Sequence, residues 1–92
     1  MPQVFKVGTY IVYFWINEGM PLEPIHVHVA EGKPVANGTK IWITEKGRAL
    51  LANNAARIPQ AKLNIIMDII EARYEDIEKL WLKKFGEIKY YC

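Results

Sequence analysis

Residues 4–16 read VFKVGTYIVYFWI, and this stretch decides the fold of the chain. It is filled with β-branched and aromatic side chains, which suit the pleated surface of a sheet. Gly8 and Thr9 interrupt the run, and a glycine at the first position of a two-residue loop is typical of a type II′ turn. The stretch therefore predicts a hairpin of two strands, residues 3–7 and residues 10–16.

The second predicted strand is apolar on both faces, because successive side chains of a strand point to opposite sides. The two sets are Tyr10, Val12, Phe14 and Ile16 on one face, and Ile11, Tyr13 and Trp15 on the other. A strand of this kind is either covered on both sides or completes a subunit interface. Dimerisation through this strand is therefore one expectation.

Three more strands are predicted between the hairpin and Pro59. Turn residues at 17–21 and the pair Glu23-Pro24 lead into a strand at 25–30. A loop rich in glycine and proline follows, and an alternating pattern predicts a strand at 40–44. After another turn, residues 48–52 form a short fifth strand.

From Pro59 the apolar period changes from 2 to 3.6, which predicts helical structure over residues 60–85. One straight helix of that length would be about 39 Å long and would overhang so small a domain. Acidic residues then precede basic ones within residues 75–84, which is the order expected of a new helix. We therefore expect two helices, or one sharply bent helix, with the change at residues 72–75. Residues 87–92 are either a last strand or a frayed end.

Together these patterns predict a single α+β domain over residues 1–92, with an antiparallel sheet of four to five strands (about 3–52) and the helical region (about 59–86) packed on it.

Twelve basic and ten acidic residues leave a net charge of +2, which does not favour strong phosphate-driven DNA binding. One cysteine, Cys92, excludes an internal disulfide, and no apolar run is long enough to span a membrane. We expect a cytoplasmic protein.

The two histidines of the chain, His26 and His28, are the strongest candidates for chemistry. Residues i and i+2 of a strand share a face, so both imidazoles should project together. Imidazole titrates near neutral pH, so the pair can act as general acid and base around a phosphodiester. Glu18 and Glu23 lie just upstream and are candidates to orient an imidazole.

Several alternatives remain open from the residues alone. His26 and His28 can bind a divalent metal such as zinc if a third ligand comes from another part of the chain. They can also be structural residues that are hydrogen-bonded to neighbouring carbonyls. No other cofactor is indicated. Lys40 and Arg48 are candidates to hold phosphate within a modest basic patch. The other members of that patch would be Lys33, Lys46 and Arg57. An aromatic platform for bases is a further alternative, made of Trp15, Trp42 and Trp81, although packing in a core explains such residues as well.

Several segments of the chain resemble a family of small bacterial proteins, domain-of-unknown-function family 4160. They are the opening hairpin, the Glu23-Pro24 and His26-Val27-His28-Val29 segments, and a helical end with Trp81 and Phe85-Gly86. Two departures are Ile25, where the family usually has a second proline, and a longer loop at 32–39.

The family is similar in size and setting to components of bacterial toxin–antitoxin modules. The resemblance therefore implies a small cytoplasmic component that acts through an antitoxin-like protein partner and on RNA. A non-enzymatic interaction or homodimer module and a His-x-His metal-binding domain are the alternatives.

Overall fold

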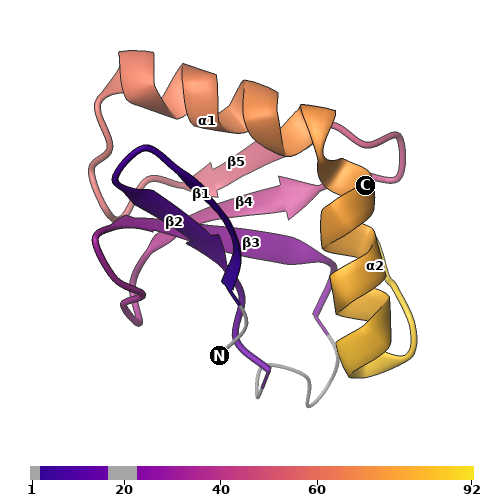
Figure 1. Cartoon of the computed structure of the whole chain (residues 1–92). Coiled ribbons are helices and arrows are strands. Elements are labelled where there is room, and N and C mark those ends of the chain that lie inside the picture. The colour runs from indigo at the N-terminus through magenta and orange to yellow at the C-terminus, as the bar shows by residue number, and fades with distance from the viewer. Residues whose placement is uncertain (1–2, 17–22) are drawn as a thin grey trace.

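The structure is a computed structural model that describes residues 3–16 and 23–92. It confirms the predicted α+β layout, with strands first and helices last (Figure 1). The strands are β1 (Gln3–Val7), β2 (Tyr10–Tyr13), β3 (His26–Glu31), β4 (Thr39–Ile43) and β5 (Ala49–Asn53), and the helices are α1 (Gln60–Ala72) and α2 (Tyr74–Phe85).

The strands form one sheet in the order β1-β2-β3-β4-β5, and every neighbouring pair is antiparallel. The hairpin prediction is confirmed, because Val7 pairs with Tyr10 across a two-residue loop and Gly8 adopts a φ of 59°. β2 ends at Tyr13, three residues earlier than predicted. Phe14 leaves the ladder and packs in the core, with its ring centroid 5.0 Å from that of Trp81.

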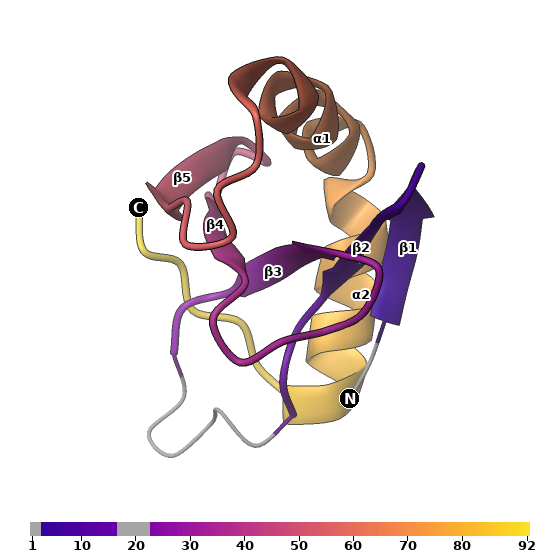
Figure 2. The same cartoon turned by 90° about the vertical axis from the view of Figure 1, so that its left-hand side faces the viewer.

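The helical region breaks into two helices at Arg73, which has φ −119° and ψ 23°. The expected change near residues 72–75 is thereby confirmed. Glu75 and Asp76 lie in the first turn of α2, and Gly86 ends the helix in the left-handed conformation. α1 lies over one face of the sheet and α2 turns steeply past the ends of the central strands (Figures 1 and 2). No helix among the described residues has both the length and the apolarity needed to cross a membrane.

The face of the sheet beneath α1, which we call the helix face, forms the main core. Alternate residues of the strands meet the buried stripe of the two helices there, as the two sequence periods require. Its fully or almost fully buried members include Val12, Val27, Val29, Ile41, Ile43, Leu63, Ile66, Ile70, Ile77 and Trp81.

The opposite face of β2 is covered by the chain itself. Ile11 and Tyr13 are buried there together with Ala30, and Val35 of the loop after β3 packs on them. The Tyr13 hydroxyl donates to the Val35 carbonyl at 2.6 Å and accepts from the Val35 N–H at 3.1 Å. Gly38 permits this close approach, since a Cβ at that position would collide with the Tyr13 hydroxyl. The apolar face that suggested dimerisation through β2 is thus already covered at Ile11 and Tyr13.

The C-terminal residues after Gly86 form neither a strand nor a frayed end. Ile25 N–H donates to the Lys89 carbonyl at 2.8 Å, and Glu45 N–H donates to the Cys92 carbonyl at 3.0 Å. The Tyr90 hydroxyl donates to Glu78 of α2 at 2.7 Å. The tail is therefore docked along the end of the sheet.

Candidate functional site

β3 carries His26 and His28 on the face opposite to the helix face. Val27 and Val29 lie between and after them and belong to the main core, so the alternation of the strand turns both imidazoles the other way. The ring centroids of the two histidines are 5.0 Å apart, with the planes at 88°. The predicted side-by-side placement is confirmed.

The His26 ring is completely buried. Its Nδ1 lies 2.9 Å from the Pro24 carbonyl oxygen, which can only accept a hydrogen bond. Nδ1 therefore donates the hydrogen of this bond. Trp42 of β4 and Trp81 of α2 contact the ring edge-on, with centroid distances of 5.7 and 5.4 Å. Backbone and aromatic neighbours thus set the position of His26.

His28 is the more accessible histidine, although only 7% of its surface is exposed. Its ring stacks on Tyr13, with the centroids 5.6 Å apart and the planes at 28°. Tyr13 is the direct partner of His28 in the β2–β3 register, and its own hydroxyl is held by Val35. His28 is therefore fixed between Tyr13 and His26.

Lys40 faces His28 from the other neighbouring strand, because the two residues are partners in the β3–β4 register. Its ammonium lies 3.1 Å from a carboxylate oxygen of Glu23 and 4.3 Å from the ring centroid of Trp42. The Lys40 side chain is 20% exposed and that of Glu23 38%. The structure thus places Lys40 opposite His28 and pairs Glu23 with Lys40. We call Tyr13, His26, His28, Lys40 and Trp42 the histidine cluster.

The tail adds a residue to this region that sequence reasoning missed. Tyr91 stacks on Trp42 with a centroid distance of 4.8 Å and an interplanar angle of 2°. Tyr13 was placed on the correct face, but its contact with His28 was also not predicted. The only local sign that the tail packs against the domain was the pair of aromatic residues Tyr90 and Tyr91. Nothing in the sequence near residue 91 indicates a contact with residue 42.

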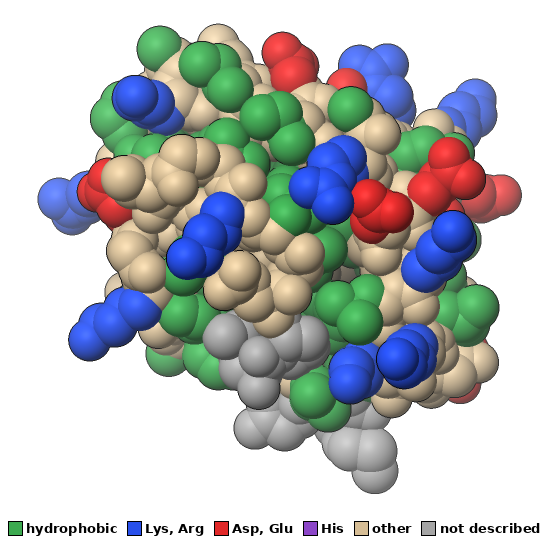
Figure 3. All heavy atoms as spheres, viewed as in Figure 1, with side chains coloured by type: hydrophobic (Ala, Val, Ile, Leu, Met, Phe, Trp, Pro, Cys, Tyr) green, Lys and Arg blue, Asp and Glu red, His purple; other side chains and the backbone are tan. Residues whose placement is uncertain are grey.

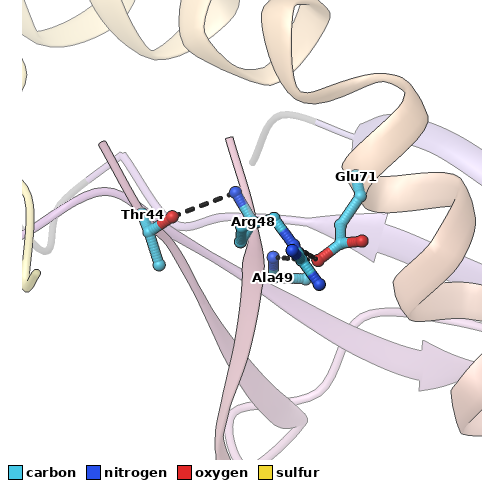
Figure 4. A network of polar contacts seen from close by, with 4 residues as sticks. All are labelled: Thr44, Arg48, Ala49 and Glu71. Carbon is cyan, nitrogen blue, oxygen red and sulfur yellow. Dashed lines mark hydrogen bonds and ion pairs between the residues drawn. The ribbon is translucent and has the colours of Figure 1, made fainter. Parts of the chain in front are cut away.

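Arg48 lies outside the histidine cluster. Its guanidinium Nε donates to Glu71 of α1 at 2.8 Å, and the same carboxylate oxygen accepts from the Ala49 N–H at 2.9 Å (Figure 4). The Thr44 hydroxyl oxygen accepts a hydrogen bond from the Arg48 N–H at 3.0 Å. The hydrogen bond from Arg48, followed by that from Ala49, holds the pKa of Glu71 below its ordinary value. Arg48 thus links the start of β5 to α1. Glu18, the remaining predicted site residue, lies outside the described residues.

The wider basic patch and the aromatic platform are not assembled as single surfaces. Lys33, Lys46 and Arg57 lie in three different loops. Figure 3 shows lysine and arginine side chains scattered over the face in view rather than gathered in one place. Trp81 is in the core, with 1% of its surface exposed, whereas Trp42 lies under Tyr91. Trp15 packs on Ile11 and Tyr13 instead, so the three tryptophans serve mainly as packing residues.

Two imidazoles are the only metal-ligating side chains in the histidine cluster. Across residues 3–16 and 23–92, no group of three or more His, Cys, Asp or Glu side chains is arranged to hold a metal ion. A zinc site at His26 and His28 stays a prediction that needs a further ligand.

Comparison with known proteins gives one match. Residues 9–82 match the model of the family described as Domain of unknown function (DUF4160). No curated protein and no solved structure matches the chain. The matched segment includes β2 to β5, α1 and most of α2, and with them every member of the histidine cluster. The chain therefore belongs to the DUF4160 family.

Proposed function

We propose that this chain is a toxin–antitoxin-type component that cleaves RNA at the histidine cluster and works with a protein partner. The observation that carries the proposal is that His28 contacts His26 on its own strand and is the cross-strand partner of Lys40, while His26 Nδ1 donates to the Pro24 carbonyl. An imidazole and an ammonium carried by partner residues of neighbouring strands combine a proton acceptor with a positive charge for phosphate. The dependence on a protein partner is inferred from the similarity in size and setting between this family and toxin–antitoxin components.

In this proposal His28 is the general base. It accepts the proton of a ribose 2′-hydroxyl, the 2′-oxygen forms a bond to phosphorus, and the bond from phosphorus to the 5′-oxygen breaks. The products are a 2′,3′-cyclic phosphate and a 5′-hydroxyl. Lys40 lies beside the phosphate, stabilises its developing charge and supplies the proton that the leaving 5′-oxygen takes.

His26 and Glu23 act as positioning residues. His26 is fully buried, so it acts on RNA through His28, whose ring it contacts edge-on. Glu23 holds the Lys40 ammonium through the 3.1 Å ion pair. The complete burial of His26 supports giving the two histidines different roles in this proposal, whereas the sequence alone treated them as equivalent.

The first experiment measures cleavage of a short single-stranded RNA by the wild type and by His28→Ala and Lys40→Ala variants. We expect His28→Ala to lose at least about 100-fold in rate, the usual contribution of a general base. Lys46→Ala, which removes a lysine from the loop between β4 and β5, is the matched control and should cleave like the wild type. Circular dichroism establishes that each variant is folded.

A second experiment distinguishes RNA from metal at the same residues. The imidazole NMR signals of His26 and His28 are followed while zinc is added to one sample and RNA is added to another. Selective shifts with RNA support the proposal. It is overturned if only zinc shifts the two rings, if the wild type neither binds nor cleaves RNA, or if folded His28→Ala cleaves at the wild-type rate.

A further inference from the structure

The outer edge of β5 offers backbone groups to another strand. β5 is the last strand of the sheet, and among the described residues no strand pairs with it on the side away from β4 (Figure 2). Thr44 N–H donates to the Arg48 carbonyl at 2.9 Å, so the alternation of an antiparallel ladder turns the Ala49 carbonyl and the Leu51 N–H outward. The Ala49 N–H also points outward, and Glu71 accepts its hydrogen bond.

The two edges of the sheet differ in how they are protected. Each carries one register shift, in β1 between Gln3 and Phe5 and in β5 opposite Lys40 and Ile41. β1 in addition carries Lys6, and charged side chains on an edge discourage pairing with other chains. β5 reads ALLAN and has no charge and no proline. Its Leu50 and Leu51 are 40% and 39% exposed.

The charges around β5 indicate what would pair with it. Asp68 and Glu71 of α1 share a cleft of about 430 Å³ with Arg48 and Ala49, at the start of the strand. Arg57 follows the other end of the strand and is exposed. An antiparallel second copy would bring its Arg57 toward Asp68, since Glu71 is already paired with Arg48, and the same contact would be repeated by the two-fold symmetry. The strands themselves are neutral, so no like charges oppose one another.

We propose that the β5 edge binds a second copy of this chain, with the two β5 strands antiparallel and the two sheets joined into one. Leu50 and Leu51 supply the apolar contact, and the Arg57 and Asp68 side chains of opposite copies supply the charge contact. Pairing of β5 with itself closes after two copies. Pairing of β5 with β1 would instead leave free edges and would bring in Lys6. This proposal does not depend on RNA cleavage.

Analytical ultracentrifugation over a range of concentrations tests the interface. We expect the wild type to reach twice the mass of one chain and Leu51→Lys to weaken the dimer at least about tenfold, because it places like charges on a paired edge. Leu82→Lys is the matched control, since Leu82 is 48% exposed on α2, and it should dimerise like the wild type. Circular dichroism establishes that the variants are folded.

A charge exchange separates the interface from a general effect on folding. Arg57→Glu and Asp68→Arg should each weaken the dimer, and the double variant should recover most of the affinity. The proposal is overturned if the wild type stays monomeric at the highest concentration, if Leu51→Lys dimerises as tightly as the wild type, or if the double variant shows no recovery.

Discussion

The two faces of this sheet are made from alternate residues of the same strands, yet they differ in chemistry. The helix face of β3 and β4 presents Val27, Val29, Ile41 and Ile43 to α1 and α2, and all four are completely buried. The opposite face presents His26, His28, Lys40 and Trp42, and it is partly covered by a loop, by the C-terminal tail and by Trp81 of α2. One face therefore stabilises the fold by burying apolar surface, while the other holds polar groups through individual contacts.

The largest effect is expected from a cavity on the helix face. Ile70→Ala removes a completely buried side chain of α1 and should lower the free energy of unfolding by about 2–5 kcal/mol. Ile65→Ala on the same helix is the control; Ile65 is 54% exposed, so the change should stay within about 0.5 kcal/mol. Urea denaturation measures both. Equal losses in the two variants would contradict the assignment of the core.

A smaller effect is expected on the face of the histidines. Tyr13→Phe removes the hydroxyl that donates to the Val35 carbonyl and accepts from its N–H, and it should cost about 1–3 kcal/mol. The amide of Val35 should also exchange faster with solvent. Tyr10→Phe, in the same strand but on the helix face, is the control. If both variants unfold at the same urea concentration, the Tyr13 hydroxyl does not fasten the loop.

The smallest effect at neutral pH concerns the tail. The hydrogen bond to Glu78, with burial as a lesser cause, raises the pKa of Tyr90 to about 12. A raised pKa means that folding favours the protonated phenol. This contribution to stability is therefore fully present below pH 10 and is lost as the pH rises through about 12. Tail docking, and with it the Tyr91 contact on Trp42, should weaken over that interval.

An ultraviolet titration of the phenolate measures this pKa directly. Glu78→Gln should return the titration of Tyr90 toward 10, whereas Glu75→Gln, a change on the same helix, should leave it raised. A wild type whose tyrosines all titrate near 10 would show that Glu78 does not fasten the tail.

Much of this architecture could be predicted because it depends on local patterns. The Gly8-Thr9 turn, the alternation through His26 and His28 and the helical period after Pro59 are each set within a few residues. The break at Arg73 was also foreseen from the order of charges in α2. The end of β2 at Tyr13 was not, because Phe14 leaves the ladder to reach Trp81, which lies 67 positions along the chain.

The candidate site also combines features set by local sequence with features set by contacts between distant segments. The sequence by itself determined that two imidazoles share one face of a strand, since that follows from the two-residue repeat of the backbone. Only the tertiary structure decided their neighbours: Lys40 opposite His28, Tyr91 on Trp42, and Arg48 bound to Glu71 instead of lying near the histidines. Strand register and tail docking are set by contacts between distant segments, and no local pattern of residues carries that information.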